Sequence, residues 1–218
     1  MKLELLIFDC DGVLVDSEEL ANRVLTEELG RLGLARGAEE VGARFKGLSL
    51  ARTMELVAQE LGRDVPAGFV ERLQRRTYEA LREGVRPVRG VREALLAIRT
   101  PVCVASSGER EKMRLTLGAT GLLPRFEGRM FSATEVARGK PHPDLFLHAA
   151  SRMGAAPRHC VVVEDSVPGV LAAAAAGMLA LGYAPCGNGR ELRSNGARTF
   201  DDMARLAGLI EELAQGDA

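Results

Sequence analysis

The chain has 218 residues, of which 46% are hydrophobic and 27% are charged, a balance typical of a globular protein. A net charge of −1 and an aromatic content of 4% give no basis for a nucleic-acid partner or for binding to an acidic membrane surface. No apolar run approaches the roughly 20 residues of a membrane span, and the N-terminus does not have the pattern of a signal peptide, so we expect a cytoplasmic protein.

Five strand-like runs alternate with helical patterns along most of the chain. They cover residues 3–9, 100–106, 128–133, 159–165 and 178–183. This alternation predicts βαβ units and a parallel sheet. The runs are nearly continuous in Val, Leu, Ile and Cys, which is typical of a sheet covered on both faces. We therefore predict an α/β fold with a Rossmann-like parallel sheet core.

The alternation is interrupted between residues 17 and 84, where we find no convincing strand. "SEELANRVLTEELGRLG", "SLARTMELVAQELG" and "GFVERLQRRTYEALREG" all have apolar residues at helical spacing. The Gly and Pro of "REGVRPVRG" suit the point where the chain would return to the sheet. We predict a core domain of residues 1–16 and 85–218, with residues 17–84 inserted as an α-helical cap domain.

Acidic and hydroxyl side chains follow the predicted strands. Ligand sites of open α/β sheets form at the carboxyl ends of strands, so these side chains are expected to meet in one crevice. Together with a lysine that precedes the fourth run, they are Asp9, Asp11, Ser106, Ser107, Lys140, Glu164 and Asp165.

One lysine cannot neutralise four carboxylates, whereas a hard divalent cation can. Mg²⁺ binds carboxylates together with water and a substrate phosphate, so the pattern indicates a Mg²⁺ site that receives an anion. Lys140 would be the second cation on that anion. Ser106, followed by Gly108 and a predicted helix, would offer a hydroxyl and backbone N–H donors to it.

Four segments together resemble the haloacid dehalogenase (HAD) superfamily, in the phosphatase branch with a helical cap after the first motif. They are "FDCDGVLVDS", "VASSGE", "GKPHPDLF" and "VVVEDSVPGVLAAAAAGM", in the order of the family. The resemblance implies an enzyme that hydrolyses a phosphate monoester. Asp9 would be the nucleophile that becomes an aspartyl-phosphate, and Asp11 the general acid and then the general base.

The same resemblance implies a role for the other residues. Mg²⁺ would be held by the Asp9 carboxylate, the Asp11 backbone carbonyl and Asp165, with Glu164 acting through water. Ser106 and Lys140 would bind the transferring phosphoryl group. Ser107 is grouped with them as a phosphate-binding candidate, although a turn residue is its simpler interpretation.

Two alternatives remain open at this point. A sugar-phosphate mutase resembling β-phosphoglucomutase would share the cap, but such an enzyme carries a cap histidine where this sequence has Ala21. A non-catalytic module that binds a phosphorylated ligand would be expected to lack one of the catalytic or metal-binding residues, and all of them are present.

The cap segment 43–53, "ARFKGLSLART", is predicted to face the site and to select the substrate. Arg44, Lys46 and Ser49 would suit an anionic, hydroxylated leaving group, so we expect a sugar phosphate or sugar-acid phosphate. We expect no macromolecular partner beyond a weak homodimer of an otherwise monomeric enzyme.

Overall fold

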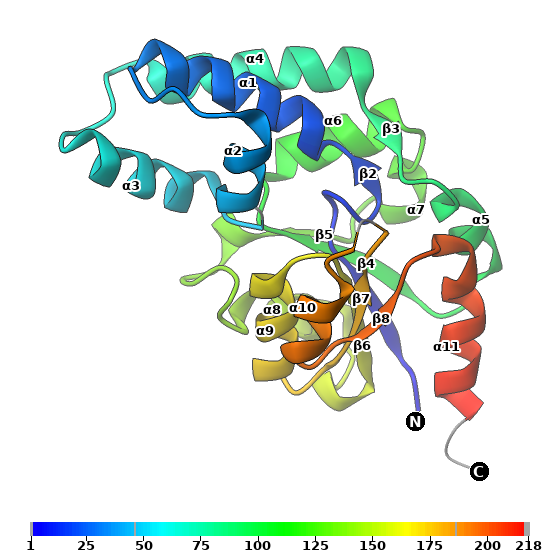
Figure 1. Ribbon diagram of the computed structural model, residues 1–218. Coiled ribbons are helices and arrows are strands. Elements are labelled where there is room, and N and C mark those ends of the chain that lie inside the picture. Colours follow the sequence, from blue (N-terminus) through cyan, green and yellow to red (C-terminus); the bar gives the residue numbers. More distant parts are fainter. Residues whose placement is uncertain (1, 46, 186, 216–218) are drawn as a thin grey trace.

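A parallel sheet of six strands forms the centre of the molecule (Figure 1). The computed structural model describes residues 2–45, 47–185 and 187–215. In spatial order the strands are β5 (Met130–Ser132), β4 (Val102–Ser106), β1 (Leu5–Phe8), β6 (Cys160–Glu164), β7 (Leu179–Tyr183) and β8 (Arg198–Phe200). Phe8 pairs with Val104 on one side and Val163 on the other, so β1, β4 and β6 end at the same edge of the sheet.

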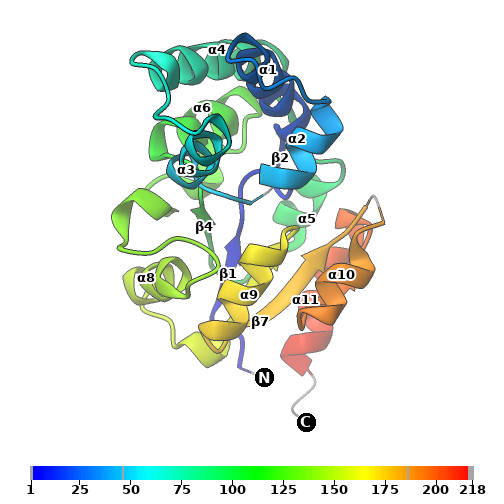
Figure 2. The same cartoon turned by 60° about the vertical axis from the view of Figure 1, so that its left-hand side comes forward.

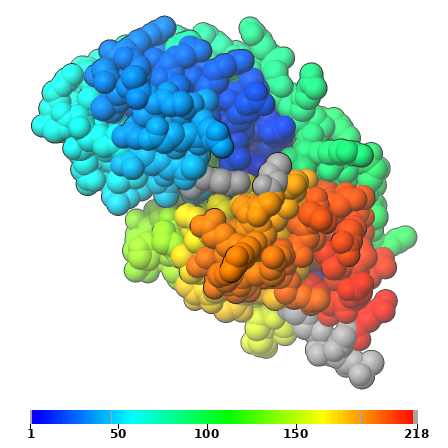
Figure 3. Space-filling view, viewed as in Figure 1, coloured from blue at the N-terminus to red at the C-terminus, as the bar shows by residue number. Residues whose placement is uncertain are grey.

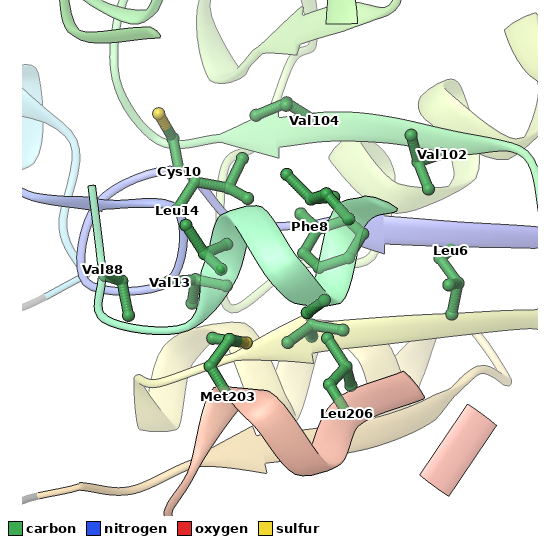
Figure 4. Close-up of a cluster of buried hydrophobic side chains, with 14 of the residues drawn as sticks. Leu6, Phe8, Cys10, Val13, Leu14, Val88, Val102, Val104, Met203 and Leu206 are labelled. Atoms are coloured by element: carbon green, nitrogen blue, oxygen red, sulfur yellow. The ribbon is translucent and has the colours of Figure 1, made fainter. Parts of the chain in front are cut away.

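Alternate residues of each strand supply two hydrophobic clusters, one on each face of the sheet. Leu6 and Phe8 point to the cluster shown in Figure 4, whereas Leu5 and Ile7 belong to the cluster on the opposite face. The first face is covered by α5 (Val91–Ala97), α6 (Arg110–Ala119), α7 (Leu123–Phe126) and α11 (Leu206–Gln215). The second is covered by α8 (Asp144–Met153), α9 (Val167–Ala175) and α10 (Gly189–Ser194). The predicted α/β class is confirmed.

Four helices follow the first strand and lie beyond the end of the sheet where the strands finish (Figures 1 and 2). They are α1 (Glu18–Arg31), α2 (Ala38–Phe45), α3 (Leu50–Leu61) and α4 (Phe69–Gly84). Their buried residues form a third hydrophobic cluster, which draws only on this part of the chain. The short strands β2 (Val15–Asp16) and β3 (Arg86–Pro87) pair antiparallel where the chain leaves the sheet and returns to it.

These observations support the division into a core of residues 1–16 and 85–218 and a cap of residues 17–84, which we retain as a proposal. Helix α2 was not among the elements expected from the sequence, and neither was β8, where Arg198 and Thr199 interrupt the apolar run that marks the other strands. Among the described residues, no helix combines the length and the apolar character needed to cross a membrane.

Candidate active site

Asp9 lies immediately after β1, and its backbone N–H still donates to the Val163 carbonyl at 2.9 Å, so the sheet fixes its position. Lys140, in the loop before α8, donates from Nζ to Asp9 Oδ1 at 2.5 Å and to Glu164 Oε1 at 2.6 Å. The side chain of Lys140 is only 1% exposed. A buried ammonium of this kind requires anionic partners, and the two carboxylates supply them.

Glu164 ends β6 and is held by donors on both of its oxygens. While Oε1 accepts from Lys140, Oε2 accepts from the Asp165 and Ser166 backbone N–H groups, each at 2.9 Å, and from Ser166 Oγ at 2.8 Å. The Ser166 hydroxyl also accepts from the Gly169 N–H and so caps α9. Glu164 therefore joins the lysine to the start of α9.

Asp11 has a different environment from Asp9. Its Oδ1 accepts a hydrogen bond from the Ser17 hydroxyl, and its Oδ2 accepts one from Lys112 Nζ at 2.9 Å. Gly12, which follows it, has a φ of +79° and leaves room for Asp165, because a Cβ at Gly12 would lie 2.5 Å from Asp165 Oδ2. This turn brings Asp165 beside the Asp9–Asp11 segment.

The two serines at the end of β4, Ser106 within the strand and Ser107 just after it, make different contacts. Ser106 Oγ accepts from the Gly108 N–H at 3.1 Å and lies on the inner wall of the site. Ser107 Oγ instead donates to the Gly47 carbonyl of the cap at 3.1 Å. In this arrangement the Ser107 hydroxyl links the core to the cap. Its contact with phosphate stays a prediction.

A cavity of about 690 Å³ lies between the cap helices and the carboxyl edge of the sheet. The space-filling view shows the cap helices seated directly on the core (Figure 3). The core contribution to the cavity wall includes Asp9, Asp11, Ser106, Ser107, Lys140, Glu164 and Asp165. The structure therefore brings all seven predicted core residues to one cavity.

The three predicted cap residues have different outcomes. Ser49 lines the cavity, and its hydroxyl also caps α3 by accepting from the Arg52 N–H at 3.2 Å. Arg44 does not line the cavity: its guanidinium pairs with Glu60 and lies 5.7 Å from the centre of the Phe45 ring. Lys46 lies outside the residues that the structure describes.

A family model for haloacid dehalogenase-like hydrolases matches residues 3–177 of the chain. The chain belongs to this family. It is 31% identical to the 6-phosphogluconate phosphatase of Escherichia coli K12 over 94% of this chain and 93% of that one. It is 34% identical to hexitol phosphatase A of the same organism over 81% of each chain. The predicted HAD membership is confirmed.

The fold of the hydrolase also matches solved members of the family. A haloacid dehalogenase-like protein of unknown function from Agrobacterium tumefaciens superposes with a TM-score of 0.83 and 34% sequence identity. The match covers 98% of this chain and all of the other. The match therefore includes both the sheet and the helices of residues 17–84.

Electrostatics separate the two catalytic candidates of this hydrolase. Burial raises the pKa of Asp9 well above its usual value; Lys140 opposes the rise, and the nearby carboxylates of Glu164, Asp165 and Asp11 add to it. Burial also acts to raise the pKa of Asp11, but Lys112 and the Ser17 hydroxyl outweigh this effect, so the pKa is lowered. The pKa values of the two carboxyl groups are thus shifted in opposite directions before any ligand contributes its charge.

The donor set of the hydrolase suits a hard cation in its chemistry. Four carboxylates, those of Asp9, Asp11, Glu164 and Asp165, face the ammonium groups of Lys140 and Lys112, which leaves an excess of negative charge for a divalent ion to balance. Within residues 2–45, 47–185 and 187–215, no three Asp, Glu, His or Cys side chains are gathered as a ready-made metal cluster. Both Glu164 oxygens already have protein donors, so Glu164 is a weaker candidate for a direct ligand.

Lys112 is the residue of this site that sequence reasoning missed. It occupies the first turn of α6, where the helix dipole disfavours a positive charge. A lysine at that position, six residues after the predicted Ser106, is the signal that could have pointed to it. Ser17, at the end of the first motif, was likewise not assigned a role.

Proposed function

We propose that this hydrolase releases phosphate from a small phosphate monoester through an aspartyl-phosphate on Asp9, with Mg²⁺ as cofactor. Its family and its phosphatase relatives make it a phosphoric monoester hydrolase. The observation that carries the mechanistic proposal is the pairing of Asp9 with Lys140 at the inner wall of a cavity that Asp11 also lines.

In the first step a carboxylate oxygen of Asp9 attacks phosphorus, and the bond from phosphorus to the ester oxygen breaks. Asp11 donates its proton to the departing oxygen, so the alcohol leaves neutral. In the second step Asp11 takes a proton from water, the water oxygen attacks phosphorus, and the bond to Asp9 breaks. The Lys140 ammonium would balance the charge of the phosphoryl oxygens, and the Ser106 hydroxyl would donate a hydrogen bond to one of them.

The charges of the ligands favour the required protonation states. The first step needs an ionised Asp9 and a protonated Asp11, whereas in the protein alone the pKa of Asp9 is raised and that of Asp11 is lowered. A cation beside Asp9 lowers its pKa, and a phosphate dianion beside Asp11 raises the pKa of that group. When bound, Mg²⁺ supplies positive charge to the phosphoryl oxygens; Asp9, Asp165 and the Asp11 carbonyl would hold it, with Glu164 behind them.

The wall of the cavity favours hydrolysis over sugar-phosphate transfer. Ala21 lines the cavity, so a methyl group occupies the position where the mutase resemblance requires a histidine. Since all three histidines of the chain lie after residue 141, the cap contains none. We therefore place the mutase second.

The cap also points to the type of leaving group. Among its described residues that line the cavity, none is Lys, Arg or His, and the one charged residue is Glu18. The remainder combines apolar side chains such as Phe45 and Met54 with uncharged polar ones such as Asn22 and Thr77. This wall suits an uncharged, hydroxylated leaving group better than an acid, so within the expected sugar phosphates we favour a polyol or sugar phosphate over a sugar-acid phosphate.

We also propose that the enzyme is cytoplasmic and that it is a monomer or a weak homodimer. Its partner is a small-molecule phosphate ester. Nothing in its charge or composition calls for a nucleic acid or a membrane.

Phosphate release from a panel of esters in the presence of Mg²⁺ tests the function. The decisive pair is glucitol 6-phosphate and 6-phosphogluconate, which share a carbon chain. At the end remote from the phosphate the first carries an uncharged CH₂OH group and the second a carboxylate. We expect release from both, with a higher kcat/KM for the polyol ester. The Asp9→Asn variant should lose at least ~1,000-fold in kcat, because an amide cannot form the covalent intermediate.

Three outcomes would contradict parts of this proposal. Conversion of β-glucose 1-phosphate to its 6-phosphate isomer without phosphate release would favour the mutase. Binding of the esters without turnover would favour the non-catalytic module. A preference for the carboxylate-bearing ester would overturn the assignment of an uncharged leaving group and leave the phosphatase intact.

A further inference from the structure

Lys112 has a contact that the functions assigned above do not use. Its Nζ lies 2.9 Å from Asp11 Oδ2, and the side chain is 21% exposed where it borders the cavity. It comes from α6, in the core, whereas Asp11 lies in the loop after β1, about 100 residues earlier in the chain. The fold therefore brings this lysine to the carboxylate from a separate element.

The surroundings of Lys112 favour this contact over an alternative one. Burial of Lys112 removes water from its ammonium group, which acts to lower the pKa of the lysine. The charge of Asp11 compensates for this loss of water and raises the pKa of Lys112. The neighbouring Glu109 accepts instead from the cap, from Gln74 at 2.7 Å and from Tyr78 at 3.2 Å. The geometry thus directs Lys112 to Asp11.

Asp11 needs such support because of the loop that carries it. The residue lies beyond the last paired residue of β1 and is followed by Gly12 in a left-handed conformation. Its carboxylate is anchored on one oxygen by Ser17, which immediately precedes the cap helix α1, and on the other by Lys112 from the core. Of these two anchors, Lys112 belongs to an element that packs on the sheet itself.

We propose that Lys112 is a positioning residue: it holds the Asp11 carboxylate in the orientation from which the proton reaches the oxygen of the leaving group. This inference rests on the proposed function. The proton transferred is the one on Asp11, and Lys112 neither donates nor accepts it. Misplacing a catalytic group by about 1 Å can cost ~100-fold in rate, so the loss of one anchor should be measurable.

The role predicts a dependence on the leaving group. An alkoxide departs slowly unless it receives a proton, whereas p-nitrophenolate departs without one. The test compares benzyl phosphate with p-nitrophenyl phosphate, two esters of similar size that differ in this need. Their kcat/KM values report only the steps up to the first phosphoryl transfer. Effects of the mutation on hydrolysis of the aspartyl-phosphate therefore do not change these values.

We expect Lys112→Met to raise the ratio of kcat/KM for p-nitrophenyl phosphate over benzyl phosphate by at least ~10-fold. Lys112→Arg, which keeps a donor cation, should restore much of the original ratio. In an Asp11→Asn background, Lys112→Met should change the ratio no further, since the two residues act as one unit. Arg114→Met is the matched control, because it removes an exposed cation of the same helix that pairs with Glu127.

Equal losses for both esters would overturn the inference, because they would mean that Lys112 supports the fold or binds the phosphate. A lower ratio in Lys112→Met would overturn it too, because it would mean that Lys112 acts by lowering the pKa of Asp11. Unchanged kcat/KM for both esters would overturn it as well. Thermal unfolding of each variant separates a folding defect from a kinetic one, and Lys112→Arg remains the informative variant if Lys112→Met does not fold. Failure of the unmodified protein to hydrolyse either ester would instead overturn the proposed function, and this inference with it.

Discussion

Glu164 illustrates how closely a single residue of this site is constrained. Both of its oxygens are engaged, and the adjacent turn of α9 leaves no space beside them. A Cβ added at Gly169 would lie 1.8 Å from Glu164 Oε1, far inside van der Waals contact. The glycine in "VEDSVPGV" is therefore required by a neighbouring side chain, since its own φ is not in the left-handed region.

Gly169→Ala should displace Glu164 and with it Lys140. We expect a loss of about 1–3 kcal/mol in the free energy of unfolding from overpacking, and a fall in kcat of at least ~10-fold. Gly208→Ala is the control, because it adds a methyl group in α11 with nothing within 4 Å. Chemical denaturation and phosphate release measure the two effects. A Gly169→Ala variant as stable and active as the Gly208→Ala variant would contradict this account.

At the scale of elements, the cap depends on an ionic cluster between α1 and α4. The Glu28 side chain is fully buried on α1 and accepts hydrogen bonds from Arg72 and Arg76 of α4 and from Arg31 of its own helix. Burial acts to raise the pKa of Glu28, but the hydrogen bonds from Arg72 and Arg76 prevail and hold it below the usual value of 4.5. The charged cluster thus joins two helices that the hydrophobic cluster of the cap also holds together.

Because the folded-state pKa of Glu28 is lowered, its contribution to stability is present above pH 4.5 and is lost as the pH falls below that value. Glu28→Gln should cost about 2–3 kcal/mol at pH 7, because the half-buried Arg72 and Arg76 lose a charged acceptor that is itself buried. The difference from the unmodified protein should shrink towards pH 3. The more exposed Glu27→Gln is the control, because Glu27 also pairs with Arg76. Urea denaturation at several pH values measures both, and a difference that does not depend on pH would refute the ionic explanation.

At the scale of the whole molecule, the cavity exists only when the cap and the core are in place together. The Ser107 hydroxyl reaches the Gly47 carbonyl, and Gln74 and Tyr78 reach Glu109, so the loop between β4 and α6 contacts two separate parts of the cap. The proposed metal ligands Asp9 and Asp165 are more than 150 residues apart in the chain and meet only through the pairing of β1 with β6.

Since these ligands meet only in the folded chain, Mg²⁺ should stabilise the fold as well as support activity. At a concentration about 100 times its Kd, the gain is about 2.7 kcal/mol, seen as a rise in Tm. EDTA should abolish phosphate release and remove this rise. Asp165→Asn, which weakens one ligand, is the comparison variant. Full activity in EDTA, or a Tm that Mg²⁺ leaves unchanged, would refute the metal assignment.

The sequence by itself determined the parts of this protein that depend on local pattern. Strands buried on both faces are continuous apolar runs, so five of the six strands of the central sheet could be predicted. Acids that follow such runs identified Asp9, Asp11, Glu164 and Asp165 as site candidates. Helical spacing gave three of the four cap helices. β8 lacks such a run, because it begins with Arg198 and Thr199, and α2 has only Val41 and Phe45 as buried residues.

Only the tertiary structure decided which side chains meet across the chain. Lys112 contacts Asp11, and Ser107 turns to the cap, because packing of α6 and of the cap on the sheet fixes distances that local sequence does not encode. The same holds for Arg44: its charge suggested a substrate contact, but in the structure it pairs with Glu60. A charged side chain chooses its partner by proximity in space, and proximity is set by the fold as a whole.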